Sequence, residues 1–442
     1  MKIIFASLLI ASIFSVANTG GFQKAIGTSG MDNGKIILNT EDGYIVVGEK
    51  SSADHQRKEI LIYKTDKDGN LNWAKSYGGT ETYVVNDAYL DENNHIHLSS
   101  ERYLSNRESL LYMKLDENGN LETSVPYDEG GNEVEPWAIA PTENGGNIIV
   151  GFTKVADYVP GGFYNASLET KHLYILGMDA NGNKLWSKKL KTPEILASNA
   201  YDIIKTDDNN YLIVGNYVTQ TEAVNIIIKI NTAGTIIWQK VNENSKIDLR
   251  YIDKAENNNY IITGTSFSSS NTNQEIAAIK IDNQGNILWS KEFGNLKQEK
   301  IKGAVVNQNG EILISGTSKS FNSRAEQIVL LNLDINGNLQ WTNKYGNGVL
   351  NDPSNLILDF GNIVFSGFSL KTDNGPETTL IKTNSSSSTQ REVLFNENNM
   401  TVNFTDKTIS FEIVNETSFS GSYNLNQTSV QSLSLNSINI NL

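Results

Sequence analysis

The sequence predicts an all-β protein made of repeated four-stranded units, and three observations carry that prediction. A turn of the form Asp-x-x-Gly-x-x-x-Trp recurs at a period of about 50 residues. A second series of glycines marks the end of another strand in nearly every period. No segment beyond the first 20 residues shows a sustained helical periodicity. Four antiparallel strands at this spacing are typical of a blade of a β-propeller.

The turn glycines set the length of the repeat. They are Gly69, Gly119, Gly182, Gly234, Gly285 and Gly337. A tryptophan stands four residues after five of them, at Trp73, Trp186, Trp238, Trp289 and Trp341, whereas Thr123 follows Gly119. Because a buried indole contributes a large apolar area, we interpret these five tryptophans as structural residues of the core.

The second glycine series gives seven copies of one strand. Six copies end at Gly48, Gly151, Gly215, Gly264, Gly316 and Gly367. We align the second unit through His95-Ile-His-Leu-Ser99, which places His95 where other units have Tyr44, Tyr211 and Tyr260. Short Asn-Gly and Asp-Gly turns join many of the strands, so consecutive strands should be antiparallel neighbours.

The strand count predicts how the ring closes. The last unit supplies three strands between residues 353 and 383, and no fourth strand with a tryptophan follows them. Near the other end, Phe22-Gln-Lys-Ala-Ile-Gly27 matches Trp73-Ala-Lys-Ser-Tyr-Gly78 position by position. We therefore expect a seven-bladed β-propeller over residues 21–383, closed by this N-terminal outer strand.

Both ends of the chain depart from the repeat. Residues 1–17 contain Lys2, about a dozen apolar residues and a Ser-Val-Ala ending, which predicts a signal peptide cleaved after Ala17. Its apolar run is shorter than the roughly 20 residues of a membrane span, so we expect a secreted or cell-surface protein without a span. Residues 384–442 begin with a serine run and continue with short alternating segments, which predicts a Ser/Asn-rich linker and a small C-terminal β appendage.

Composition narrows the classes of partner. The formal net charge is −14, whereas nucleic-acid binding usually relies on a basic surface, so we expect no nucleic-acid partner. The chain has no cysteine and therefore neither disulfides nor a lipid-modified cysteine. A fold of this size can be stabilised by its hydrophobic core without disulfides. We also expect the protein to be a monomer.

The repeated turn resembles the tryptophan-docking motif of quinoprotein-type (PQQ-like) propellers, which have one more residue between Asp and Gly. In that family the tryptophan wedges between neighbouring blades, which implies the same role for the five tryptophans here. The metal-ligating acidic and amide cluster and the vicinal cysteine pair of that family have no counterpart, so we expect no cofactor. Sialidase-type propellers carry a related turn at another spacing, but the six scattered arginines here do not suggest a carboxylate-binding trio.

Signal, propeller and β tail together look like secreted proteins of the Bacteroidetes. This resemblance implies that residues 384–442 are a C-terminal sorting domain of the type nine secretion system. The tail lacks the Pro-Asn-Pro start and the closing Gly-x-Tyr strand of such domains, so a truncated sorting domain is the form that the resemblance implies.

Three residue patterns receive a structural interpretation. The Asp/Asn-rich turns before the glycines are explained by Asx-turn hydrogen bonds without calcium. His95 and His97 share a strand face but lack a recognisable third ligand, so we expect no metal site. Lysines two residues after the tryptophan position should be solvated charges that discourage pairing between sheet edges. They are Lys24, Lys75, Lys188, Lys240 and Lys291.

One unit breaks the repeat and offers a candidate ligand site. Between Gly151 and Gly215 the chain is about a dozen residues longer than in the other units. The excess holds Tyr158, Phe163 and Tyr164, in a loop expected on the face where propellers commonly bind ligands. Drift of the loop length without function is the alternative.

No catalytic set is recognisable, so we predict a secreted, non-catalytic scaffold for ligand, glycan or protein binding or adhesion. The alternative is a secreted glycan-active enzyme with paired carboxylates around the central channel. The acids that could form such a pair stand on the first strands of their units and are Asp87, Glu135, Asp202 and Asp253.

Overall fold

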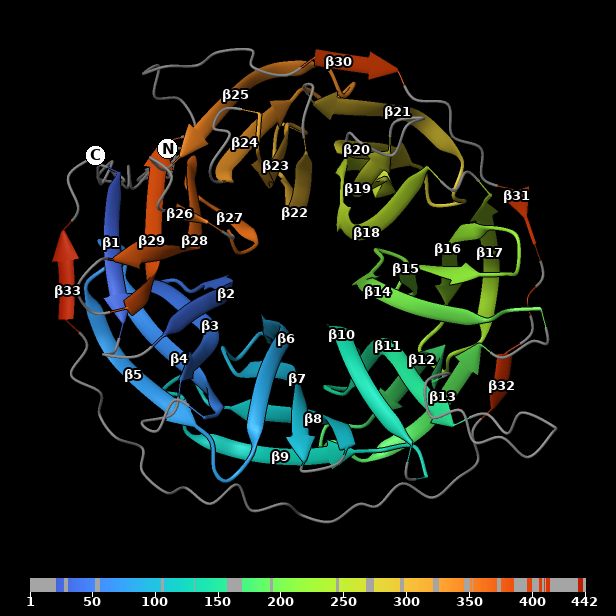
Figure 1. Cartoon of the computed structure of the whole chain (residues 1–442), viewed down its shortest axis with the longest axis horizontal. Coiled ribbons are helices and arrows are strands. Elements are labelled where there is room, and N and C mark those ends of the chain that lie inside the picture. The colour runs from blue at the N-terminus through green and yellow to red at the C-terminus, as the bar shows by residue number, and fades with distance from the viewer. Residues whose placement is uncertain are drawn as a thin grey trace, which may run out of the picture.

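The computed structural model describes most of the chain between residues 21 and 384 and short parts of the C-terminal segment (Figure 1). The described residues are 21–27, 31–51, 56–104, 107–130, 132–156, 169–190, 194–243, 246–267, 274–294, 298–320, 326–345, 350–351, 353–371, 375–384, 396–399, 405–407, 409, 411–413 and 436–439. Within them no helix is long and apolar enough to cross a membrane.

Seven antiparallel sheets surround a central channel, each with its first strand innermost (Figure 1). Blade 1 consists of β2 (Asp32–Asn39), β3 (Gly43–Ser51), β4 (Lys58–Asp66) and β5 (Leu71–Tyr77). Blade 2 consists of β6 (Thr82–Leu90), β7 (Ile96–Leu104), β8 (Arg107–Leu115) and β9 (Leu121–Tyr127). Blade 3 consists of β10 (Glu133–Pro141), β11 (Asn147–Ala156), β12 (Glu169–Met178) and β13 (Lys184–Leu190).

The remaining blades follow the same order. Blade 4 consists of β14 (Ala197–Lys205), β15 (Tyr211–Val218), β16 (Ala223–Ile230) and β17 (Ile236–Asn242). Blade 5 consists of β18 (Ile247–Lys254), a 3-10 turn (Glu256–Asn258), β19 (Tyr260–Phe267), β20 (Gln274–Ile281) and β21 (Ile287–Gly294). Blade 6 consists of β22 (Glu299–Val306), β23 (Ile312–Ser318), β24 (Gln327–Leu333) and β25 (Leu339–Tyr345). Blade 7 consists of β26 (Leu350–Asn351), β27 (Leu356–Asp359), β28 (Asn362–Lys371), β29 (Gly375–Asn384) and β1 (Phe22–Gly27).

The N-terminal strand closes the ring as the sequence predicts. β1 pairs antiparallel with β29, from Phe22 opposite Lys382 to Ile26 opposite Thr378. Buried apolar side chains of the described residues form seven clusters, one at each junction between neighbouring blades. The all-β, seven-bladed propeller is therefore confirmed.

The alignment of the second blade is wrong by one residue. Asp91 N donates to His95 O at 3.0 Å, so His95 ends the turn and β7 begins with Ile96. Ile96 pairs with Leu90 as Tyr44 pairs with Asn39 in blade 1, and Ser100 takes the place of the strand glycine. Hydrogen bonding of the turn thus decides the register, which the match of residue types alone misplaced.

The outer strands of all blades except blade 6 approach the turn of the next blade. A Cβ built on Gly234 of blade 4 would stand 2.7 Å from the ring of Trp186 of blade 3, and φ at Gly234 is +73°. Trp186 Nε1 also donates to Thr232 O at 3.2 Å. The rings of Trp73, Trp238 and Trp289 lie against Gly119, Gly285 and Gly337 in the same way. A glycine is required here because a side chain would meet the indole and would have to adopt a left-handed backbone conformation.

Three junctions depart from this pattern. Blade 2 has Thr123 in place of tryptophan, and Tyr112 and Val125 approach the turn at Gly182 instead. At the closure, Phe22 of β1 lies against Gly69 of blade 1. Trp341 of blade 6 is buried with apolar residues of blade 7 such as Phe365.

The lysines of the outer strands also bridge blades. Lys24, Lys75 and Lys291 donate to the side-chain oxygens of Asn70, Asn120 and Asn338 in the next blade, at 2.7–2.8 Å. Lys240 reaches Asn286 at 3.3 Å, and Lys188 reaches Gly234 O at 2.5 Å. Their interpretation as solvated edge charges is therefore wrong for Lys24 and Lys291, which are buried. Each of the five Nζ atoms also has an acceptor in the neighbouring turn.

The predicted C-terminal β appendage consists of short strands that lie apart from one another around the outside of the ring (Figure 1). They are β30 (Asn396–Asn399), β31 (Thr405–Asp406), β32 (Phe411–Ile413) and β33 (Asn436–Asn439). Each adds a further strand to the outer edge of one blade.

The docking of tryptophan on glycine makes a prediction for Gly234→Ala. The substitution should lower the free energy of unfolding by about 2–4 kcal/mol, the sum of left-handed backbone strain and overpacking against Trp186. Gly361→Ala is the matched control, because φ is +81° there and no neighbouring atom lies within 4 Å of the added Cβ. The control should lose only about 1–2 kcal/mol from backbone strain. Equal losses in denaturant unfolding would show that the indole contact contributes nothing.

Candidate functional site in the central channel

The inner strand carries a β-bulge at the same point in blades 1 to 6. At each bulge one extra residue interrupts the pairing with the second strand of the blade. These six bulge residues are Lys35, Asn86, Trp137, Tyr201, Arg250 and Lys302. Because a bulge redirects a side chain and frees it from the ladder, the propeller presents six equivalent positions around its channel.

A cavity of about 500 Å³ lies within this ring of bulge residues. The inner strands of blades 1 to 6 and residues 353–355 of blade 7 contribute to its wall, and all bulge residues except Arg250 line it directly. Its volume is within the range of about 300–1,000 Å³ that is usual for small-molecule sites. The channel therefore holds a concave site of the size that a small molecule needs.

One side of the cavity is aromatic. The rings of Trp137 and Tyr201, from blades 3 and 4, meet edge to face with centroids 5.5 Å apart. The guanidinium of Arg250 in blade 5 lies 3.8 Å from the centroid of Tyr201 and is held by Asp248 at 2.8 Å through Nε. Trp137 remains 39% exposed, so its ring is available to a ligand.

The part of the wall that blades 1 and 2 contribute is polar. Lys35 forms an ion pair with the buried Glu49 and donates to Val85 O at 3.0 Å. Asn86 Nδ2 donates to Glu101 Oε1 at 2.9 Å, and Asn86 Oδ1 accepts from Glu101 N at 3.0 Å. These side chains are held in place by residues of blades 1 and 2, so a ligand would meet a polar wall that is already ordered.

Two of the predicted acids clamp neighbouring blades together. Asp87 Oδ2 accepts from Ile139 N of blade 3 at 2.9 Å, and Asp202 Oδ2 accepts from Ile252 N of blade 5 at 2.8 Å. The other oxygen of each accepts the next backbone N–H of its own strand at 2.8 Å. Asn355 of blade 7 makes the equivalent bond with Ile37 N of blade 1 at 2.8 Å. The position after the bulge thus serves as an inter-blade clamp at three junctions.

The third channel acid is held less firmly. Asp253 follows two residues after Tyr251 on the same strand, and its side chain accepts from Lys254 N at 2.7 Å. Burial raises the pKa of Asp253 and of Asp87 to about 7, against the opposing effect of their backbone hydrogen bonds. Burial, with the charges of Asp87 and Asp253, raises the pKa of Asp202 well above its usual value.

Glu135 lies apart from these three acids. It contacts Lys154 Nζ at 2.6 Å, and the same ammonium contacts Glu108 at 2.6 Å and Glu133 at 3.1 Å. Burial and a hydrogen bond with Glu108 raise the pKa of Glu135 to about 7. Glu135 precedes the bulge at Trp137 and pairs with Phe152, and its side chain joins this charged cluster rather than the cavity. The structure therefore brings three of the four predicted acids to the channel.

The predicted loop residues Tyr158, Phe163 and Tyr164 lie outside the described residues. Sequence reasoning missed the bulge residues, and one signal could have found the most informative of them. Of the six tryptophans, Trp137 alone stands outside the repeated position after a turn glycine. A large aromatic residue where the repeat does not demand one is a better indicator of a ligand site than the repeated tryptophans.

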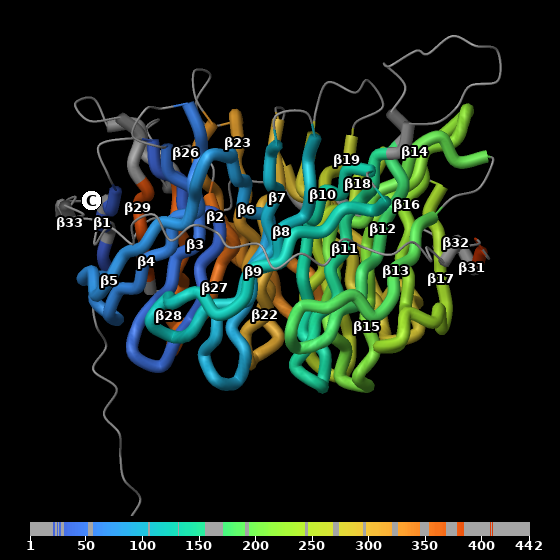
Figure 2. Tube along the Cα trace, turned by 90° about the horizontal axis from the view of Figure 1, so that it is seen from below, coloured from blue at the N-terminus to red at the C-terminus, as the bar shows by residue number. Residues whose placement is uncertain are grey.

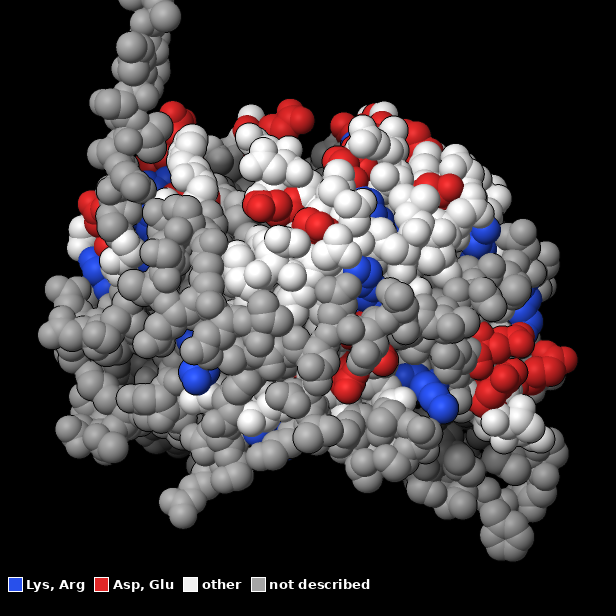
Figure 3. All heavy atoms as spheres, turned by 90° about the horizontal axis from the view of Figure 1, so that it is seen from above, with Lys and Arg blue, Asp and Glu red and all other residues white. Residues whose placement is uncertain are grey.

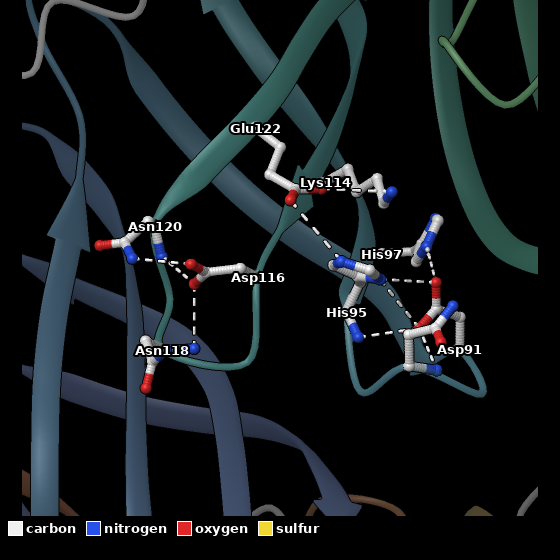
Figure 4. Close-up of polar contacts among 9 residues, drawn as sticks. Asp91, His95, His97, Lys114, Asp116, Asn118, Asn120 and Glu122 are labelled. Atoms are coloured by element: carbon white, nitrogen blue, oxygen red, sulfur yellow. Dashed lines mark hydrogen bonds and ion pairs between the residues drawn. The ribbon is translucent and has the colours of Figure 1, made fainter.

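The two histidines of blade 2 belong to a local network (Figure 4). Asp91 contacts His95 Nδ1 at 2.9 Å and His97 Nε2 at 3.3 Å, and the hydroxyl of Tyr112 lies 2.9 Å from His97 Nδ1. His97 is buried, which lowers its pKa, and it stacks on Tyr89. Across the described ranges, no group of three or more histidine and acidic residues is arranged to hold a metal ion.

The outer surface shows no extended basic area in the view of Figure 3. Lysine and arginine side chains of the described residues lie scattered there, and acidic side chains gather along the upper edge and in a group at the lower right. This distribution agrees with the formal net charge of −14. The channel, rather than this surface, concentrates the residues that could recognise a ligand.

The clamp makes a prediction for two substitutions of Asp87. Asp87→Ala leaves Ile139 N without its acceptor and should cost about 1–3 kcal/mol of stability. Asp87→Asn should preserve the bond, as Asn355 does in blade 7. Because the folded pKa of Asp87 is raised to about 7, its stabilising contribution is complete below its usual pKa near 4 and is lost as the pH rises through 7.

Denaturant unfolding at about pH 4.5 and pH 8 separates the loss of the hydrogen bond from the effect of the raised pKa of Asp87. The stability of Asp87→Asn relative to the unsubstituted protein should increase between the two pH values, because asparagine does not titrate. A constant difference would contradict the raised pKa, and an unaffected Asp87→Ala would contradict the clamp.

No family model matches the sequence, and no curated protein matches it. Similar solved structures include a protein of unknown function from Bacteroides caccae, 12% identical with a TM-score of 0.40, over 74% of this chain and 94% of that chain. The phage phi92 endosialidase is 11% identical with a TM-score of 0.47, over 84% of this chain and 70% of that chain. Puromycin hydrolase is 11% identical with a TM-score of 0.49, over 78% of this chain and 51% of that chain. At these values the likenesses carry no argument about function.

Proposed function

We propose that this protein is a non-catalytic binding protein that holds a neutral saccharide in its central cavity. The observation that carries the proposal is the mixed ring of bulge residues, in which Trp137 and Tyr201 share one cavity with amide and amine side chains. A sugar ring has a similar mixed character, since its C–H face is apolar and its hydroxyl edge is polar. Aromatic side chains with polar groups beside them would therefore satisfy both of its surfaces.

The charge balance of the cavity favours an uncharged ligand. Lys35 is already paired with Glu49, and Asp87 and Asp253 have pKa values raised to about 7. The site is therefore less negative at neutral pH than three channel carboxylates would suggest. A neutral ligand avoids the cost of desolvating an unmatched charge in the channel.

The contacts of the channel acids support binding over catalysis. Hydrolysis of a glycosidic bond generally needs two carboxyl groups that are free to exchange protons or attack the sugar. Asp87 and Asp202 instead use both oxygens to hold backbone N–H groups of two blades. Only Asp253 among the three lacks an inter-blade hydrogen bond in the described structure. The glycan-active enzyme remains the second candidate because these acids do meet at one cavity.

The proposal includes export of the protein. Residues 1–17 have the composition of a signal peptide, which would bring the propeller to the cell surface or the surrounding medium. Free and polymer-linked sugars are available as ligands in that setting. Detection of the mature chain in culture medium or on intact cells, beginning after Ala17, tests this part of the proposal.

A glycan array with neutral and acidic glycans tests the ligand class, followed by calorimetric titration with the best neutral glycan. Trp137→Ala should weaken binding about tenfold or more, the equivalent of at least 1.4 kcal/mol, because the ligand loses its stacking surface. Tyr201→Phe should bind normally if the ring face, rather than the hydroxyl, is used. Phe360→Ala is the matched control, because Phe360 is 79% exposed in the turn between β27 and β28 and is not part of the cavity.

Three results would count against the proposal. Preference for acidic glycans would overturn the assignment of a neutral ligand. Unchanged affinity of Trp137→Ala would remove the channel from the binding site. Release of shorter sugars from the bound glycan, abolished by Asp253→Asn, would establish the enzyme alternative instead.

A further inference from the structure

The C-terminal segment follows the outer rim of the propeller. Its short strands β30, β31 and β32 pair antiparallel with β21, β17 and β13, the outer strands of blades 5, 4 and 3. The last strand, β33, pairs antiparallel with β1 in blade 7. The described parts of this segment, residues 396–399, 405–407, 409, 411–413 and 436–439, are called the strap below.

The twist of the blades explains why one segment can pair with several sheets. Strands near the channel run roughly along its axis, whereas outer strands such as β5, β9 and β13 run mainly around the rim (Figures 1 and 2). A chain that follows the rim therefore remains parallel to the edge of one blade after another. Because the pairing is antiparallel, the strap meets blades 5, 4 and 3 in the reverse of their order in the sequence.

The strap is anchored by side chains as well as by strand pairing. Ile409 is only 7% exposed and belongs to the apolar cluster at the junction of blades 3 and 4. Gln239 Nε2 of β17 donates to Ile409 O at 3.0 Å. Lys407 Nζ lies 3.3 Å from Glu243 Oε1. An apolar anchor with flanking polar contacts indicates a specific position on the rim.

The last strand of the strap brings the two ends of the chain together. β1 lies between β29 on one side and β33 on the other, with Ala25 opposite Thr379 and Ile438. The same strand carries Phe22 and Lys24, which dock on Gly69 and Asn70 of blade 1. β1 therefore closes the ring, and it would be an exposed edge strand without β33.

We propose that the C-terminal segment is a strap that locks the closed ring from outside. It holds β1 in blade 7 and covers the strand edges of blades 3, 4, 5 and 7, which could otherwise pair with strands of other molecules. Opening of the ring then requires β1 to separate from two partners rather than one. This role does not depend on the ligand of the channel.

A designed disulfide tests the pairing of the chain ends directly. The protein has no cysteine of its own, so Ala25→Cys with Ile438→Cys introduces a single possible bridge. Residues that face each other in an antiparallel pair have Cα atoms about 4.5–5.5 Å apart, which suits a disulfide. Under mild oxidation the folded monomer should form this bridge nearly completely, and its thermal midpoint should exceed that of the reduced form.

Ala25→Cys with Ile413→Cys is the matched control. Ile413 pairs with Lys188 in blade 3, so its cysteine should remain free in the folded monomer. Failure of the first pair to form a bridge in the folded protein, or equal yields for both pairs, would overturn the proposed strap.

A second measurement tests whether the strap stabilises the closure. Ile438→Pro removes a backbone N–H from β33 and should weaken its pairing with β1. Amide hydrogen exchange in residues 22–27 should then become at least tenfold faster. Ile409→Asp should instead increase exchange in β17 and leave β1 protected, whereas Ile237→Asp, at a 49% exposed position of β17, should change neither. Unchanged exchange of β1 in Ile438→Pro would show that the strap does not hold the closure.

Discussion

The docking of outer strands on the turns of the next blades, seen at six of the seven junctions, is the interaction on which the ring depends. Trp186 on Gly234 shows its parts: the indole covers a glycine that has no room for a side chain, and Lys188 reaches the carbonyl of the same residue. The turn is ordered by its own first side chain, as Asn231 Oδ1 accepts from Thr235 N at 2.9 Å here and Asp66 accepts from Asn70 N at 2.8 Å in blade 1. The repeated sequence motif and the packing between blades therefore have the same cause, because the residues of the motif form the contact between neighbouring blades.

Because these contacts hold the ring together, the side chains that line the channel can differ from blade to blade. The clamp position after the bulge is an acid or an amide at three junctions, but the bulge residues range from lysine to tryptophan. Trp137 and Tyr201 can differ from Lys35 because the bulge removes these side chains from the ladder and from the blade core. The repeat thus supports the fold, and its irregular positions hold the groups that a ligand would meet.

The channel acids show how a structural role and a candidate site can share residues. Asp87 and Asp202 were candidates for catalysis because they stand on inner strands, and they do line the cavity. Their oxygens, however, hold backbone N–H groups across blade junctions. Burial raises the pKa values of both carboxyl groups despite these hydrogen bonds, so the raised values do not require a proton-transfer role. The sequence could not distinguish Glu135 from these acids, because the side chain of Glu135 is held away from the cavity by an ion pair with Lys154 of the next strand.

The sequence by itself determined the strand content, the number of blades and the closure by residues 22–27, because turns and buried aromatic residues are local and repeat with the blade. Only the tertiary structure decided which residues meet in the channel. A bulge is defined by hydrogen bonds between strands, so neither the position of Trp137 nor the register at Ile96 follows from the order of residue types. The path of the strap also required the structure, because it depends on outer strands that twist toward the rim.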